Sequence, residues 1–425
     1  MLNLQNLQNL QNPQNHSKPF FEVPSVMLRL FLSVLLLLSV PAFAQKPLRG
    51  VVLDANGGAP LPGASVFLSN TSTGTVANSR GEFELAFPAG KYDLVVSAVD
   101  YETYSHSFTV AELPERLTVR LKPKAKELAG IVVQPYEKDG WKKWGQFFLE
   151  NFMGTSDEAR RCVIRNKETL RFRLNRVTNQ LTAVAREPLV IENKALGYRI
   201  TYQLEDFTYN YGSRVVSFYG FPLYQELEGG AGRARKWAAA RRAAYYGSMM
   251  HFMRALYRNR LAEEGFIIYA LRKIPDIARI AKTEQLEQGR LIVLNNGTML
   301  RSDEPDDTLR AYQPQLGREP VLTLVDGHRL AGDNLAYAAD SATAVLDFTN
   351  YISVNYDRAK TPDAYQRTVR NGNYAMQSEL CLLSGHPVVV ESTGYHYNPM
   401  DLFSNGWWAW NEKMARMLPF DYKPE

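Results

Sequence analysis

Three residues near the C-terminus have side chains of the types that bind metals. His386, Glu391 and His396 are spaced five positions apart in a segment that reads as β-strand. Because side chains alternate between the two faces of a strand, His386 and His396 would share one face and Glu391 would lie on the other. A transition metal needs its ligands to converge. We therefore predict no metal site here, and stoichiometric zinc in the purified protein would be the contrary result.

An acidic segment is a second candidate, for a hard cation. Asp303, Glu304, Asp306 and Asp307 surround Pro305, and calcium prefers oxygen ligands such as carboxylates. The segment lacks the alternating ligands and the central glycine of an EF-hand loop. We interpret it as a solvated acidic turn, against which a calcium-dependent rise in melting temperature would count.

Cys162 and Cys381 are the two cysteines of the chain. In an oxidising compartment they can form one disulfide, since only one pairing exists. Two separate buried thiols are the alternative, because unpaired cysteine is often buried. The sequence leaves both open, and non-reducing mass mapping distinguishes them.

Local catalytic motifs are missing from the sequence. It contains no Gly-x-Ser-x-Gly, Ser-x-x-Lys, Cys-x-x-Cys or His-Glu-x-x-His. The run Gly229-Gly-Ala-Gly232 lacks the lysine of a P-loop and reads as an ordinary loop. We therefore assign no catalytic, cofactor-binding or metal residue and expect no cofactor. A site assembled from distant positions stays open, because a catalytic triad needs no local motif.

Basic residues concentrate in one stretch, where the sequence predicts helical structure over Arg235–Glu264. The cations are Arg233, Arg235, Lys236, Arg241, Arg242, Arg254, Arg258 and Arg260, and their apolar partners include Trp237, Tyr245, Met249, Phe252 and Leu256. This pattern is typical of an amphipathic helix. We interpret the cations as the wet face of a packed helix. Peripheral contact with anionic lipid is the alternative, which liposome flotation tests.

Three of the 6 tryptophans, Trp407, Trp408 and Trp410, lie in a second predicted helix, Gly406–Leu418. Trp407 and Trp410 share a helical face with Met414 and Met417. We expect this face to dock on the core. Stacking on sugars or insertion at a membrane interface is the alternative.

The elements that position these residues begin after a secretion signal. Residues 27–44 combine basic Arg29, an apolar run from Leu30 to Val40, and a small-x-small site before Gln45. The run is shorter than the roughly 20 residues that span a bilayer. Residues 1–26, with their tandem Leu-Gln-Asn repeats, read as a mis-assigned start or a disordered leader. The signal predicts export to the periplasm or the outer membrane, with no transmembrane helix in the mature chain.

Composition narrows the class of protein. The chain has 425 residues, of which 45% are hydrophobic and 22% charged, as in ordinary globular proteins. That length accommodates two or three domains. The formal net charge of +5 is too small to predict a nucleic-acid partner without a focused patch.

Residues 46–133 show period-two alternation. Apolar residues alternate in Ala64-Val66-Leu68, Phe83-Leu85-Phe87 and Tyr92-Leu94-Val96, with turn clusters between them. Many short strands at regular spacing predict an all-β sandwich.

The same region resembles the carboxypeptidase regulatory-like domain. The resemblance is carried by Gly50-Val-Val-Leu-Asp54, Pro60-Leu-Pro-Gly-Ala-Ser-Val66, Gly74-Thr75, Gly81-Glu-Phe83 and Gly90-Lys-Tyr92, with a closing strand at Leu128–Val133. It implies a transthyretin-like sandwich without catalytic residues, which in carboxypeptidases sit in a separate zinc domain. The sequence departs from the family at Asp100-Tyr101, where glycine usually precedes the aromatic residue.

The sequence of the rest of the chain argues against two classes of protein that carry this module. A zinc carboxypeptidase needs His-x-x-Glu, and none of the 6 histidines has glutamate three positions later. A receptor barrel needs a long series of strands, whereas the body reads as blocks of strands and helices. We expect a linker at 134–140 and an α+β body at 141–425.

These observations predict a non-enzymatic exported binding or assembly protein. In it the sandwich acts as an adaptor for a protein partner in the envelope. The alternative is an envelope hydrolase that acts on peptide or glycan through a dispersed site in the body.

Overall fold

The computed structural model describes residues 47–88, 90–109, 112, 114, 116–124, 135–275, 291–293, 299–301, 321–340, 343–369, 375–396 and 399–424. Four predicted features lie outside the described residues. They are the leader at 1–26, the signal at 27–44, the closing strand at Leu128–Val133 and the acidic segment at Asp303–Asp307.

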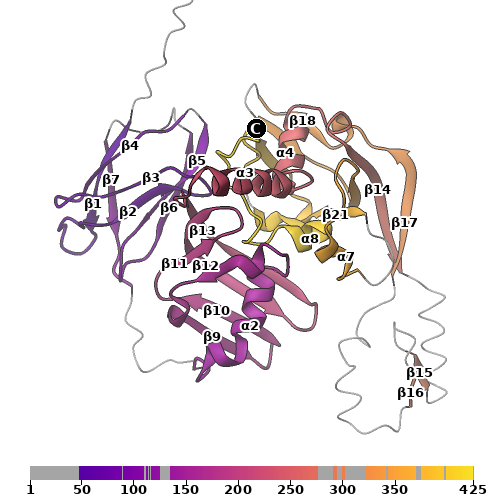
Figure 1. The fold of residues 1–425 in the computed structure, drawn as a ribbon, viewed down its shortest axis with the longest axis horizontal. Helices are drawn as coiled ribbons and strands as arrows, with labels where there is room; N and C mark the ends of the chain where they lie inside the picture. Colours follow the sequence, from indigo (N-terminus) through magenta and orange to yellow (C-terminus); the bar gives the residue numbers. More distant parts are fainter. Residues whose placement is uncertain are drawn as a thin grey trace, which may run out of the picture. The chain divides into compact units, whose positions relative to one another are not determined.

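The N-terminal part is the predicted β-sandwich, drawn in indigo and purple in Figure 1. One sheet has the order β4-β1-β7 and the other β3-β2-β5-β6. The strands are β1 (Leu48–Asp54), β2 (Ser65–Leu68), β3 (Gly74–Val76), β4 (Glu82–Leu85), β5 (Lys91–Ser97), β6 (Tyr104–Thr109) and β7 (Arg116–Leu121). In β4, Phe83 and Leu85 are buried, while Glu84 between them is exposed. This alternation forms the core between the sheets.

The departure from the family at Asp100 affects one turn only. Asp100 has φ 65°, in the left-handed region, which aspartate tolerates better than most residues. The Tyr101 hydroxyl donates to the Asp54 carboxylate at 2.7 Å. The turn therefore forms with aspartate where the family has glycine.

The body begins with an antiparallel sheet and one helix. The strand order is β8-β11-β12-β10-β9, and β13 pairs with β12. The elements are α2 (Gly140–Phe152), η2 (Ala159–Arg161), β8 (Cys162–Ile164), η3 (Lys167–Thr169), β9 (Leu170–Asn175), β10 (Gln180–Ala185), β11 (Leu189–Asn193), β12 (Tyr198–Asn210) and β13 (Val215–Glu226). Phe148 of α2 packs on Phe172 and Phe207 of the sheet, with ring centroids 5.8 and 4.8 Å apart.

The predicted helical stretch forms two helices, and the second ends at Tyr257, before the predicted end at Glu264. They are α3 (Ala231–Tyr245) and α4 (Met249–Tyr257). Between them Gly247 has φ 79°, and the Ser248 side chain accepts from the backbone N–H of His251. A left-handed glycine ends a helix, and a serine N-cap begins the next one.

A second sheet and a small third one complete the body. Their orders are β17-β14-β20-β21-β23 and β18-β19-β22, and β15 pairs with β16. The elements are β14 (Phe266–Pro275), β15 (Leu291–Val293), β16 (Met299–Arg301), β17 (Val321–Arg329), η4 (Gly332–Asn334), β18 (Ala336–Ala338), β19 (Thr343–Leu346), β20 (Tyr351–Tyr356), α7 (Asp363–Gln366), β21 (Met376–Leu382), η5 (Leu383–Gly385), β22 (Val388–Glu391), η6 (Pro399–Asp401), β23 (Leu402–Gly406) and α8 (Trp407–Asn411). Blocks of strands and helices confirm the predicted α+β class.

The predicted C-terminal helix is shorter than expected. It ends at Asn411, because Glu412 has φ −78° and ψ 60° and leaves the helical conformation. Trp407 and Trp408 are nevertheless buried in the core of the second sheet. Met414 is buried in the core of the first sheet. The segment therefore docks as predicted, through a short helix followed by turns.

The sandwich and β13 are in contact within the compact unit Pro47–Glu425. The backbone N–H of Asn70 donates to the carbonyl of Pro222, and that of Tyr224 donates to the carbonyl of Thr71. A small buried cluster joins the two sides: Phe67, Val95, Phe221 and Leu223. Among the residues that the structure describes, no helix combines the length and hydrophobicity needed to cross a lipid bilayer.

Candidate functional site

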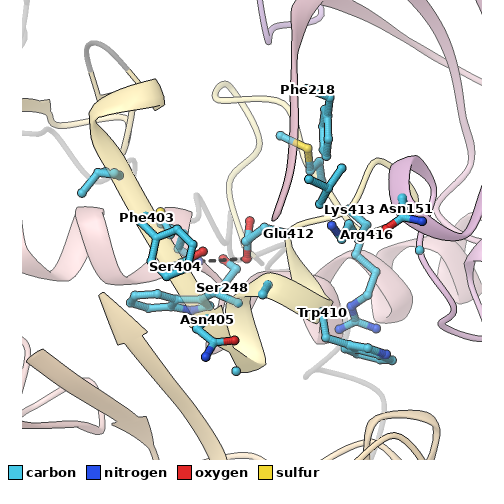
Figure 2. Close-up of a pocket in the computed structure, with 18 of the residues that line it drawn as sticks. Asn151, Phe218, Ser248, Phe403, Ser404, Asn405, Trp410, Glu412, Lys413 and Arg416 are labelled. Carbon is cyan, nitrogen blue, oxygen red and sulfur yellow. Dashed lines mark hydrogen bonds between the residues drawn. The ribbon is translucent and has the colours of Figure 1, made fainter. Parts of the chain in front are cut away.

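The main candidate site is a cavity of about 970 Å³ that is lined by residues of the body and by Asn70 of the sandwich. In Figure 2, Phe403 and Ser404 lie on one side, Lys413 and Asn151 lie on the other, and Glu412 lies between them. Its walls are mostly apolar. Such a concave apolar space with a few polar groups is the usual form of a small-molecule site.

Gly406 sets the position of the segment that lines this cavity. It joins β23 to α8 with φ 72°, and a Cβ at this position would lie 2.5 Å from the carbonyl oxygen of Gln377. Only glycine fits this turn without a shift of the backbone. Beyond it, the indole N–H groups of Trp407 and Trp408 both donate to the carbonyl of Gly247, at 2.9 and 3.0 Å.

Glu412 has a structural role at the start of α4. Its Oε1 accepts from the backbone N–H of Met249 at 3.1 Å and from the Asn411 side chain at 2.8 Å. Burial raises the pKa of this carboxyl, and these hydrogen bonds oppose the rise. A carboxylate beside a helix N-terminus satisfies free N–H groups there. Glu412 is therefore already occupied in holding α4.

Lys413 has no comparable partner. Burial lowers the pKa of its ammonium group to about 8, so it is mostly protonated at pH 7. Its Nζ lies 5.7 Å from the ring centroid of Phe218. Within the described part of the chain, no carboxylate pairs with it. The cavity thus holds a half-buried cation that could receive an acidic group.

His396 adds an unsatisfied polar atom to the cavity lining. Its Nδ1 is buried and has no hydrogen-bond partner among the described residues. Burial lowers the pKa of the imidazole to about 4, so the ring is neutral at pH 7. A buried polar atom without a partner is uncommon and is a natural contact for a ligand or an ordered water.

The structure places the three residues of the metal hypothesis separately. His386 is exposed after η5, Glu391 is the buried end of β22, and His396 pairs through its backbone with Val390. Across the described ranges, no group of three or more histidine, cysteine or acidic residues could hold a metal ion.

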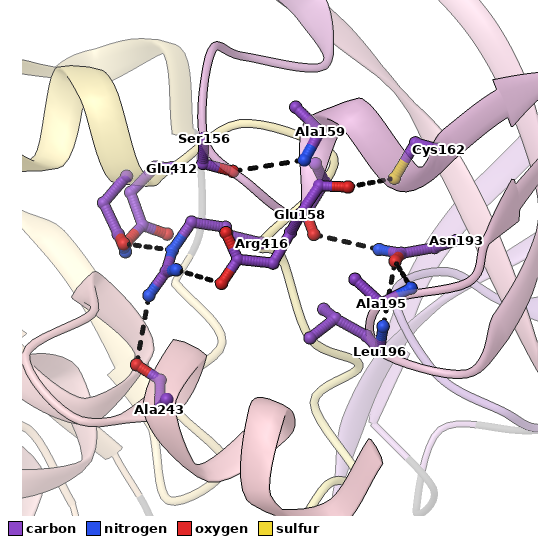
Figure 3. A network of polar contacts seen from close by, with 12 residues as sticks. Ser156, Glu158, Ala159, Cys162, Asn193, Ala195, Leu196, Ala243, Glu412 and Arg416 are labelled. Carbon is purple, nitrogen blue, oxygen red and sulfur yellow. Dashed lines mark hydrogen bonds and ion pairs between the residues drawn. The ribbon is translucent and has the colours of Figure 1, made fainter. Parts of the chain in front are cut away.

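A polar network fixes the segment that carries Lys413, as Figure 3 shows. The guanidinium of Arg416 is buried and donates to Glu158, the residue before η2. It also donates to Asn411 at 2.7 Å and to the carbonyl of Ala243 in α3 at 3.1 Å. Burial alone would raise the pKa of Glu158, but the charge of Arg416 and the hydrogen bonds to the carboxylate together outweigh burial and lower that pKa. Arg416 therefore links three parts of the body.

His251 is a second buried histidine, and both of its ring nitrogens are occupied. Nδ1 accepts from the backbone N–H of Gly247 at 3.1 Å, and Nε2 lies 3.0 Å from Glu264. Burial lowers the pKa of the ring to about 4, although Glu264 opposes this. A nitrogen that already accepts a hydrogen bond cannot serve as a free base. His251 is therefore a structural group.

The cations of the basic stretch divide into two sets. Four of them have partners. Arg241 donates to Glu226 and to the carbonyl of Leu196, and Arg254 donates to the carbonyls of Thr393 and Phe420. Arg258 forms an ion pair with Glu264, and Arg260 forms one with Glu263. The exposed ones on α3 are Arg233, Arg235, Lys236 and Arg242. The interpretation of the cations as a wet helix face therefore fits α3, whereas Arg254 of α4 is buried.

Both cysteines are free thiols in the structure. Cys162 donates to the carbonyl of Glu158 at 3.3 Å, and Cys381 is buried in β21. The disulfide stays a prediction for mass mapping to test.

Sequence reasoning missed Glu158, Lys413 and Arg416. Ordinary charged residues carry no motif, and these act through burial by elements far away in the sequence. Lys413 and Arg416 do lie next to the tryptophan-rich segment that the sequence singled out, which is the one signal that pointed to them.

Comparison with known proteins adds one firm result. Residues 48–133 match the family described as the CarboxypepD_reg-like domain. No curated protein matches the chain. Among solved structures, it is similar to a protein of Bacteroides fragilis NCTC 9343 that is described as membrane-associated and of unknown function. The identity is 10%, the match covers 81% of this chain and 92% of that chain, and the TM-score is 0.15, which supports no argument on fold or role.

The strands of the observed sandwich, from Leu48 to Leu121, fall within the range that the family model matches. Residues 48–133 are a carboxypeptidase regulatory-like domain, fused to an α+β body that contains the cavity.

Proposed function

We propose that the protein is a non-enzymatic binding protein of the cell envelope. In this proposal the regulatory-like domain is an adaptor for a protein partner, and the body holds a ligand in the cavity lined by Lys413. The ligand has an apolar part and one acidic group. The secretion signal predicted at residues 27–44 supports the location.

The observation that carries the proposal is the state of Lys413. A half-buried ammonium among apolar walls is costly unless a negative group pairs with it. Glu412 does not serve, because its carboxylate is directed to the start of α4. An acidic ligand would complete the pair, and the unsatisfied Nδ1 of His396 offers a second polar contact.

The buried histidines support binding over hydrolysis. A hydrolase of the serine or cysteine type needs a histidine free to take a proton from the nucleophile. The ring nitrogens of His251 are both engaged. His396 has its buried Nδ1 without any nucleophile bonded to it.

Ligand capture tests the cavity. The mature protein, purified from its own envelope under mild conditions, should carry an acidic amphiphile that native mass spectrometry detects. Lys413→Met should reduce its occupancy at least tenfold, while Lys142→Met, an exposed lysine on α2, should leave it unchanged. Equal occupancy in all three proteins would refute the role of Lys413.

A crosslinked pull-down of the tagged mature protein from solubilised envelope tests the adaptor. One stoichiometric partner that is lost when the regulatory-like domain is altered would support it. Recovery of the bait alone, together with turnover of peptide or glycan substrates, would favour the hydrolase.

A further inference from the structure

A second cavity, of about 720 Å³, lies where α3 meets the loop after β20. Its lining includes four cationic residues, Arg242, Arg358, Lys360 and Arg416, and one acidic residue, Glu158. Arg416 and Glu158 pair with each other at its base. The remaining three cations give the cavity a positive charge that no described lining residue offsets.

Arg242 and Arg358 are available to a ligand. Both are exposed, and no ion pair or side-chain hydrogen bond joins either of them to another described residue. Lys360 lies 3.8 Å from Asp363, but both side chains are more than 70% exposed, so this contact is weak. Guanidinium groups suit phosphate because their planar donors match two oxygens at once.

The walls between these cations are apolar and leave room. Ala239, Ala243 and Ala359 have short side chains, and Tyr246 and Tyr356 present rings. A ring or a short apolar segment of a ligand could therefore lie against the tyrosines while its charge meets the arginines. An inorganic ion alone would leave most of this surface uncovered.

The same charge continues along α3. Arg235, Ala239, Arg242 and Tyr246 recur at intervals of three or four residues and so share one side of the helix and its C-terminal turn. Arg235 thus extends the positive surface beyond the cavity, which would attract an anionic ligand before it binds.

We propose that this second cavity binds a phosphate group carried on an organic body, with Arg242 and Arg358 donating to the phosphate oxygens. The phosphate can belong to an anionic phospholipid headgroup or to a soluble sugar phosphate, since the recognised group is the same. Arg416 lines both cavities, but Arg242 and Arg358 do not line the cavity at Lys413, so either proposal can fail without the other.

Two binding assays on the full mature chain test the proposal. One is flotation with phosphatidylcholine vesicles with and without phosphatidylglycerol, and the other is calorimetry with glucose 1-phosphate. The double variant Arg242→Gln/Arg358→Gln should weaken binding at least tenfold. The control Arg176→Gln/Arg233→Gln removes the same charge from two exposed arginines outside the cavity and should weaken binding less than twofold.

The outcomes of these assays identify the source of the phosphate group or overturn the proposal. Binding to phosphatidylglycerol vesicles alone identifies a headgroup, and binding to glucose 1-phosphate identifies a soluble ligand. Equal losses in both double variants would mean that overall charge alone drives binding, which overturns the proposal. If the unmodified protein binds neither probe, the proposal is overturned as well. Urea midpoints equal to that of the unmodified protein would show that both variants are folded.

Discussion

At the scale of single residues, burial decides the chemistry. His251, His396 and Lys413 all have lowered pKa values because the charged form is poorly solvated where they lie. For His251 the geometry agrees, since only the neutral tautomer that carries its proton on Nε2 can accept the hydrogen bond that Nδ1 receives from Gly247. The neutral form of this ring is therefore part of the folded structure.

His251 should make stability depend on pH below neutrality. Its pKa is about 4 in the folded chain and about 6.5 in the unfolded one, so stability is full above pH 6.5 and falls as pH drops toward 4. Between pH 7 and pH 5 this group should account for about 2 kcal/mol of lost stability. Between the same two pH values, the free energy of unfolding of His251→Gln, measured in urea, should therefore fall by about 2 kcal/mol less than that of the unmodified protein. His386→Gln, a substitution at an exposed site, should show the same pH dependence of stability as the unmodified protein. If the stability of His251→Gln depended on pH as strongly as that of the unmodified protein, the assignment would be contradicted.

Cys162 should react slowly in the folded protein. Burial raises the pKa of its thiol to about 12, and the thiolate is the reactive form. Iodoacetamide at pH 8 should label Cys162 at least a hundredfold more slowly in the native state than in urea. If both cysteines remain unlabelled in urea until a reductant is added, the disulfide with Cys381 exists instead.

At the scale of elements, the buried pair of Arg416 and Glu158 should be a main support of the C-terminal segment. Glu158→Gln leaves a buried guanidinium without its counter-charge, which should cost about 3 kcal/mol of unfolding free energy. The neighbouring Asp157→Asn removes exposed contacts to Arg160 and Arg367 and should cost less than about 0.5 kcal/mol. Urea unfolding of both variants measures the difference, and equal effects would mean that the pair is not a main support.

The elements also show what could be predicted from the sequence. The alternation that predicted the sandwich works because one face of each strand is buried, as in β4. The break between α3 and α4 had a signal in Gly247-Ser248, a helix end followed by an N-cap. The end of α8 had none, because Asn411 and Glu412 are held by contacts to Arg416 and Met249. Those contacts depend on the tertiary fold, which also brings together the charged residues that line the two cavities.

At the scale of the whole molecule, the described sandwich and body should unfold together. Leu223 and Phe221 of β13 are buried with Phe67 and Val95 of the sandwich. All 6 tryptophans lie in the body, so their fluorescence reports on the body alone. Hydrogen exchange of peptides from β1 to β7 reports on the sandwich.

The variant Phe221→Ala/Leu223→Ala should separate the two transitions. Each truncation removes buried apolar contacts and should cost about 2 to 4 kcal/mol of coupling between the parts. In urea, fluorescence and exchange should coincide for the unmodified protein and diverge for the variant, while Val215→Ala at an exposed position of the same strand should keep them coincident. Separate transitions in the unmodified protein would mean that the sandwich folds and unfolds independently of the body.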